Sequence, residues 1–139
     1  MTFVVLRLIN ESCYYVIDME PPSNKPLIGV VGPCGSGKST LIRGLEEYGY
    51  TCRHIAQEHS HVQTMWQKIT NPDVLIFLDA SFPVSTERRK LSWQQSDHDE
   101  QQRRLRHARQ HASLLIDTDL LTPEQVLEKT LSYLKDLNL

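Results

Sequence analysis

The chain has 139 residues, of which 40% are hydrophobic and 23% are charged, and its net charge is −2. These values are typical of one globular domain that buries about two-thirds of its unfolded-chain surface. The net charge argues against a generally basic nucleic-acid-binding protein. No apolar run reaches a length of about 18 residues, which a membrane span would need. The three cysteines have neither disulfide-type nor metal-ligand spacing, so we expect a reduced, cytoplasmic protein without a membrane partner.

The first 26 residues differ in pattern from the rest, which divides the chain into an N-terminal extension (1–26) and a main domain (27–139). Phe3–Ile9 and Cys13–Ile17 are apolar enough to form two strands of a hairpin, and a proline-rich linker follows. The alternative is an extension that packs only in an oligomer, and the sequence leaves both open. A hairpin with an unpaired apolar edge would be a candidate homodimer surface.

In the main domain, short apolar segments alternate with helical patterns. The expected strands are Leu27–Val31, Tyr50–Ile55, Val74–Leu78 and Leu114–Asp117, and the expected helices are Lys38–Tyr48, His61–Ile69, Asp97–Ala112 and Pro123–Leu137. The last helix has the clearest start, with Thr122 as N-cap, Pro123 in the first turn and Gln125 completing a capping box. This alternation predicts an α/β fold with a parallel sheet covered by helices.

A glycine-rich segment directly after the first expected strand matches the pattern G-x-x-x-x-G-K-[ST]. Its residues are Gly32, Pro33, Cys34, Gly35, Ser36, Gly37, Lys38, Ser39 and Thr40. A strand, a glycine loop and a helix in this order predict a nucleotide phosphate site, because loop N–H groups and a helix N-terminus converge on the anion. Lys38 is expected to reach the β- and γ-phosphates, and the Ser39 hydroxyl is expected to ligate Mg²⁺.

A second Mg²⁺ ligand is expected at the end of the third strand, where Asp79 follows five apolar residues. A carboxylate at this place can hold the ion through a bound water. The alternative is that Asp79 caps the turn that follows it. The N-K-x-D pattern that selects guanine is lacking, since Asn24-Lys25-Pro26-Leu27 has no acid, and ATP is therefore the expected nucleotide.

With these motifs the chain resembles the small P-loop kinases, the group that holds shikimate and gluconate kinases and the nucleoside monophosphate kinases. The resemblance rests on Gly32–Thr40, Leu75–Asp79, Arg88–Arg109 and Ile116–Thr118, and it covers residues 27–137. It implies a P-loop NTPase fold of three α/β/α layers, with a mainly parallel sheet of four core strands in the order 2-3-1-4, to which the N-terminal hairpin could add. It also implies an ATP site at the strand C-termini, a lid over the phosphates and an acceptor pocket.

Seven of the fifteen lysines and arginines lie between Arg88 and Arg109. Clustered arginine in a chain of nearly neutral charge indicates a local anionic partner. The resemblance places a lid at residues 93–109, and we expect Arg106 or Arg109 to neutralise the transferred phosphoryl group. The alternative is a solvated helix whose arginines pair with nearby acids.

Glu58, just after the second strand, is the candidate general base for the acceptor hydroxyl. The chain lacks the Asp-x-Asp pattern of some relatives, so Glu58 as a surface acid stays open. His59 and His61 have no third ligand at suitable spacing, and no metal site is expected there. The short connection between the second and third strands leaves room only for a small acceptor.

The leading hypothesis is therefore an enzyme, a kinase that transfers the γ-phosphoryl group of Mg·ATP to a small metabolite or nucleotide. A first alternative is a nucleotide-binding regulatory or interaction module with little catalysis, motivated by the uncertain base and the unusual N-terminus. A second alternative is a nucleic-acid end kinase, motivated by the arginine cluster, although the charge of the chain does not favour a nucleic-acid partner.

Overall fold

The computed structural model describes residues 3–8, 14–19, 25–90 and 92–139. In the first two ranges, β1 (Phe3–Leu8) and β2 (Tyr14–Met19) pair antiparallel in a two-stranded sheet. The pairing agrees with the expected hairpin, whose turn lies outside the described residues. This sheet is separate from the main one, so the described hairpin does not extend the core sheet as the fold expectation had allowed.

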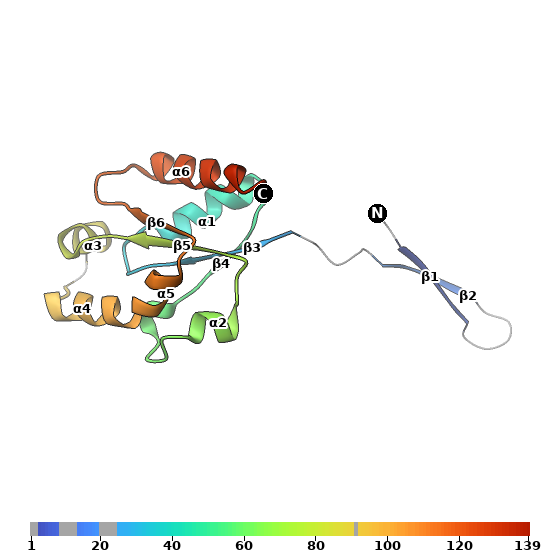
Figure 1. The fold of residues 1–139 in the computed structure, drawn as a ribbon, viewed down its shortest axis with the longest axis horizontal. Coiled ribbons are helices and arrows are strands. Elements are labelled where there is room, and N and C mark those ends of the chain that lie inside the picture. Colours follow the sequence, from blue (N-terminus) through green and yellow to red (C-terminus); the bar gives the residue numbers. More distant parts are fainter. Residues whose placement is uncertain (1–2, 9–13, 20–24, 91) are drawn as a thin grey trace.

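The remaining described chain is an α/β unit in which four strands alternate with six α-helices (Figure 1). The elements are β3 (Leu27–Val31), α1 (Lys38–Glu47), β4 (Thr51–His54), the 3₁₀ turn η1 (Gln57–His59), α2 (Met65–Ile69), β5 (Val74–Asp79), α3 (Phe82–Arg89), α4 (Gln95–Arg104), α5 (Arg106–His111), β6 (Leu114–Asp117) and α6 (Pro123–Asp136). The four expected core strands are confirmed. Helix α3 was not expected, and the single helix expected over Asp97–Ala112 is two helices that meet at Leu105.

All four core strands are parallel, in the order β4-β3-β5-β6. Numbered within this sheet the order is 2-1-3-4, so the expected order 2-3-1-4 is wrong. The connection from β4 to β5 must cross β3, and Gly29 makes room for it, because a Cβ there would collide with Ile55 and Pro72. In both orders the first and third strands lie inside the sheet, so the hydrophobic pattern of the strands could not distinguish one order from the other.

Two buried apolar clusters fill the two sides of the sheet. Helices α1 and α6 lie over one face, and α2 and α5 lie over the other (Figure 1). Leu105 and Ala108 form an apolar stripe on the arginine-rich segment and are fully buried on the second face. Burying a leucine side chain contributes about 1.5–3 kcal/mol, so α4 and α5 are anchored to the sheet through this stripe. Among the described residues, no helix has the length and apolar character to cross a bilayer.

Candidate functional site

The glycine loop, residues 32–40, connects the carboxyl end of β3 to the first turn of α1. Gly32 lies so close to β5 that a side chain there would collide with the Leu78 carbonyl oxygen. Gly37 is the N-cap of α1 with a left-handed φ of 96°, and no side chain caps this helix. The first-turn N–H groups have no intrahelical acceptors and carry the positive end of the helix dipole, so this helix start suits an anion.

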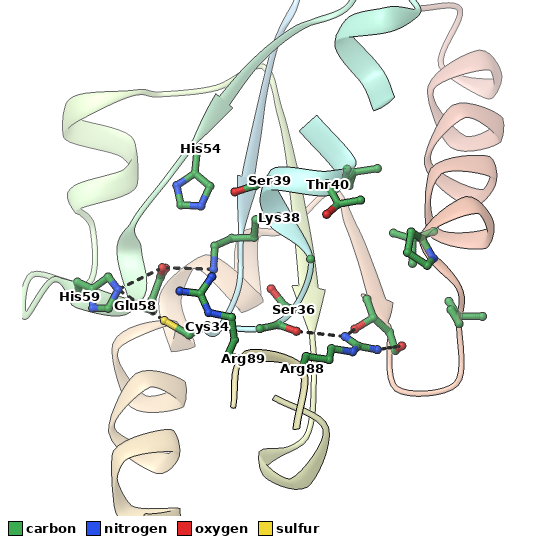
Figure 2. A pocket seen from close by; sticks show the side chains of 17 residues that line it. Cys34, Ser36, Lys38, Ser39, Thr40, His54, Glu58, His59, Arg88 and Arg89 are labelled. Atoms are coloured by element: carbon green, nitrogen blue, oxygen red, sulfur yellow. Dashed lines mark hydrogen bonds and ion pairs between the residues drawn. The ribbon is translucent and has the colours of Figure 1, made fainter. Parts of the chain in front are cut away.

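A cavity of about 430 Å³ opens at this loop. Its volume lies within the usual range of about 300–1,000 Å³ for small-molecule sites. Besides the loop, its lining includes His54, Glu58, His59, Arg88, Arg89 and Thr118, which come from β4, η1, α3 and the end of β6 (Figure 2). Three charged cations, Lys38 and the two arginines, face one carboxylate in this lining, so the cavity favours a negatively charged ligand.

Lys38 is the most deeply placed of these cations. Its Nζ donates hydrogen bonds to the carbonyl oxygens of Gly32 at 2.6 Å and Pro33 at 3.0 Å, and it lies 3.2 Å from Glu58 Oε1. Burial lowers the pKa of Lys38, and the neighbouring Glu58 carboxylate acts in the opposite direction. The structure therefore brings Lys38 and Glu58, both predicted site residues, into direct contact.

Glu58 belongs to η1 and its side chain is 2% exposed. One oxygen, Oε1, contacts Lys38 and lies 3.6 Å from His59 Nε2, whereas Oε2 is buried with no hydrogen-bond partner among the described residues. The surface role that the sequence left open for Glu58 is therefore wrong. A buried carboxylate oxygen without a donor is costly, so this atom is suited to an additional partner in the cavity.

Arg88 and Arg89, at the end of α3, are site residues that the sequence analysis missed. Arg88 donates to the Gly35 carbonyl at 3.2 Å, to Thr118 Oγ1 at 2.9 Å and to the Thr118 carbonyl at 2.6 Å. Arg89 lies beside Lys38 in Figure 2, and its charge adds to the lowering of the Lys38 pKa. A signal was present, because Ser81 followed by Phe82-Pro83 is a typical helix start.

The predicted lid residues Arg106 and Arg109 are not part of the described lining of this cavity. Arg106 lines a second cavity along α4 and α5. The Nη2 atom of Arg109 donates to Asp79 Oδ2 at 2.5 Å, and its guanidinium lies 4.6 Å from the centre of the Phe77 ring. Neither arginine therefore lines the glycine-loop cavity in this structure, and the expected role at the transferred phosphoryl group stays a prediction.

Asp79 also lies outside the described lining, although it ends the strand next to β3. Besides Arg109, its carboxylate accepts hydrogen bonds from Gln102 Nε2 at 2.9 Å and from the Ala80 N–H at 3.0 Å. The contact with Ala80 is the turn-capping role that the sequence left as an alternative. Ser39, in the first turn of α1, does line the cavity. The structure thus keeps the two predicted Mg²⁺ ligands in different surroundings.

His54, at the end of β4, is a further lining residue that the sequence did not indicate (Figure 2). Partial burial and the nearby Lys38 ammonium lower the pKa of His54, which favours the neutral imidazole. A neutral imidazole can donate or accept a hydrogen bond without adding charge to the cavity.

A scan against protein-family models and a search of curated proteins found no match to this chain. The cavity itself remains the guide to function, because a helix N-terminus, three cations and one buried carboxylate surround a space of small-molecule size.

Proposed function

We propose that this chain is a P-loop protein of the small-kinase type that binds ATP with Mg²⁺ and transfers the γ-phosphoryl group to a small acceptor. The observation that carries the proposal is the buried Lys38 at the uncapped start of α1, with Arg88 and Arg89 on the same cavity. Backbone N–H groups, an ammonium and guanidinium groups are the donors that a triphosphate requires.

In this proposal Lys38 exchanges the carbonyl oxygens of Gly32 and Pro33 for phosphate oxygens. Arg88 and Arg89 take the charge-neutralising role that the sequence had suggested for Arg106 and Arg109, because the α3 arginines already line the cavity. The Ser39 hydroxyl supplies one Mg²⁺ ligand. Asp79 would supply the second only after its contact with Arg109 opens.

Glu58 is the proposed base. When Lys38 turns to phosphate, the carboxylate is left in the cavity without its ammonium partner. The acceptor hydroxyl gives its proton to Glu58, its oxygen forms a bond to the γ-phosphorus, and the bond from that phosphorus to the bridging oxygen breaks to release ADP.

The test of nucleotide binding is calorimetry with Mg·ATP on the whole chain and on Lys38→Ala. Charge-assisted hydrogen bonds contribute about 1.5–3 kcal/mol each, so the variant should bind at least about tenfold more weakly. Lys68→Ala, which removes an exposed lysine of α2, should bind as the unchanged chain does. Because Lys38→Ala leaves Glu58 buried without a partner, the double variant Lys38→Ala/Glu58→Gln should also lose binding. Undiminished ATP affinity in both Lys38 variants would contradict the proposal.

One observation favours the second candidate, a nucleotide-binding module with little catalysis. Lys38 is held by loop carbonyls and Glu58, and Asp79 is held by Arg109 and Gln102, so the phosphate-side and metal-side groups are both engaged by the protein. ADP release, measured against a library of hydroxyl and phosphate metabolites, separates the two functions. Stimulation by an acceptor, lost in Glu58→Gln, supports the kinase; intact ATP binding without any stimulated release supports the module.

A further inference from the structure

Cys34, Glu58 and His59 converge at the end of the glycine-loop cavity where the loop meets η1 (Figure 2). Cys34 comes from the loop, and the other two residues are neighbours in η1. Cys34 Sγ lies 3.6 Å from His59 Nε2, and the same nitrogen lies 3.6 Å from Glu58 Oε1. All three donor atoms lie within 4.8 Å of one another.

These separations match the coordination sphere of a tetrahedral metal ion. Zinc binds thiolate at about 2.3 Å, imidazole at about 2.0–2.1 Å and carboxylate at about 2.0–2.2 Å. Tetrahedral angles then place a sulfur and a nitrogen, or a nitrogen and an oxygen, about 3.4–3.6 Å apart. Two of the three separations are therefore close to those that a bound ion would need. The third, between Cys34 Sγ and the Glu58 oxygen, lies within 4.8 Å, so a tetrahedral ion would draw these two side chains closer together.

A second observation concerns Glu58 Oε2, the buried oxygen that lacks a hydrogen-bond partner among the described residues. Its sister oxygen already contacts Lys38. The separation from His59 is measured to Oε1, so an ion held by Cys34 and His59 would meet the Glu58 carboxylate on that side, and a bidentate or rotated carboxylate would give Oε2 the partner that the protein does not supply.

The surroundings of Cys34 support the same conclusion. Gln101 is buried on α4 and contacts Cys34 twice: its Nε2 donates to Sγ at 3.3 Å, and its Oε1 accepts from the Cys34 N–H at 3.0 Å. A donor directed at the sulfur fixes the position of the side chain. Outer hydrogen bonds of this kind orient the ligands of metal sites.

We propose that Cys34, Glu58 and His59 form a binding site for a divalent transition metal ion, with Zn²⁺ as the expected occupant. Sulfur, nitrogen and oxygen donors together favour such an ion, whereas Mg²⁺ and Ca²⁺ take oxygen ligands. All three residues line the glycine-loop cavity, so the fourth ligand, a water or an anionic oxygen, comes from that cavity. The site uses neither of the Mg²⁺ ligands proposed at Ser39 and Asp79, and ion binding needs no nucleotide. It shares Glu58 with the proposed general base, so an ion bound there would occupy the carboxylate that the transfer needs.

The experiment titrates the full chain, without a polyhistidine tag, with Zn²⁺ and separately with Co²⁺, in the absence of nucleotide and Mg²⁺. Zn²⁺ affinity is measured by competition with a chromophoric chelator, and Co²⁺ binding by its absorption spectrum. We expect one ion per chain and a sulfur-to-cobalt charge-transfer band. Cys34→Ser should lose the band, and His59→Ala, which removes a side chain that is 58% exposed, should weaken Zn²⁺ binding at least about tenfold.

Matched controls are available on the same chain. His61→Ala removes the next histidine along, and Cys52→Ser removes the other described free cysteine, neither of which belongs to the cluster. Both should keep the affinity and the band, as should Cys13→Ser. The proposal is overturned if the unchanged chain binds no Zn²⁺, if Cys34→Ser and His59→Ala bind as tightly as it does, or if a control variant loses the ion to the same extent. Because no nucleotide is present, none of these outcomes depends on ATP binding.

Discussion

Two groups of arginines, separated by thirteen residues in sequence, have opposite environments in the structure. On α4 and α5 the partners are acids: Arg103 and Arg104 contact Glu100, and Arg109 contacts Asp79. At the end of α3, by contrast, Arg88 donates only to carbonyl and hydroxyl oxygens in its described hydrogen bonds.

The difference shows why a cluster of arginines in sequence does not locate an anion site by itself. A guanidinium paired with a carboxylate has most of its field cancelled, whereas one that is hydrogen-bonded to neutral oxygens keeps its charge for a ligand. Arg88 is also held in place by the loop and by Thr118, so little ordering is left to do when an anion binds. The paired arginines are therefore largely neutralised within the fold, whereas Arg88 keeps its charge at the cavity.

The largest expected effect separates these two groups directly. Arg89→Ala removes a cation from the cavity and should weaken Mg·ATP binding about tenfold or more, because it removes a charge-assisted contact with phosphate. Arg106→Ala is the matched control, since it removes an exposed arginine from α5 outside the cavity lining, and it should change the affinity less than about twofold.

Calorimetry on both variants is sufficient, with Arg88→Ala as a third member of the series. Arg88→Ala should also weaken binding, but it breaks the contacts with Thr118 and Gly35, so its unfolding midpoint must be measured alongside. If Arg106→Ala weakened ATP binding more than Arg89→Ala, the division into two groups would be wrong and a lid movement of α5 would be required.

A smaller effect is expected for the pair formed by Asp79 and Arg109. This pair tests whether the arginines of α4 and α5 stabilise the fold. The two side chains are 24% and 35% exposed, so solvent weakens their attraction, and the interaction energy should be about 1 kcal/mol. Urea unfolding of Asp79→Ala, Arg109→Ala and the double variant measures it. Gln102, which contacts both residues, stays in all variants.

An interaction energy near zero in this double-mutant cycle would mean that the pair of Asp79 and Arg109 does not stabilise the fold. Arg109 would then be free to leave Asp79, as the proposed Mg²⁺ role of Asp79 needs. The same measurement repeated with Mg·ATP shows whether the ligand competes with the pair, since competition lowers the interaction energy.

The elements of the core could be predicted from sequence because each carries a local signal. The strand Val74–Asp79 is apolar up to its last residue, and the helix that starts at Pro123 has both parts of its capping box, in which Thr122 and Gln125 bond to each other's backbone. The strand order could not be predicted, since the interior strands are the same in both arrangements. The strand order depends on the connection from β4 to β5, which passes close to Gly29 through residues distant from it in sequence.

For the site, the glycine loop and its lysine were predictable because the motif is contiguous. Glu58 was identified as a candidate, and the structure places it against Lys38. The α3 arginines were not singled out because α3 has a weak hydrophobic pattern, with Ser85 as its only buried residue among those described, while the family resemblance placed a lid at Arg106 and Arg109. Which arginine reaches the cavity depends on tertiary packing, and no local pattern encodes that.

The smallest expected effect concerns Glu100, which accepts hydrogen bonds from Arg103 and Arg104. Chiefly the Arg103 hydrogen bond lowers the pKa of Glu100 to about 2. A lowered carboxyl pKa favours the folded state above the ordinary value of about 4.3, and this contribution is lost as the pH falls toward 2. Because Glu100 faces solvent, screening keeps the contribution small, and Glu100→Gln should leave the urea midpoint at pH 7 unchanged within error.

An NMR titration should show the Glu100 pKa rising in Arg103→Gln, with Arg106→Gln as the control that leaves it in place. A pKa that stayed near its ordinary value in the unchanged chain would show that these arginines are not neutralised, and the contrast with α3 would then rest on Arg109 alone.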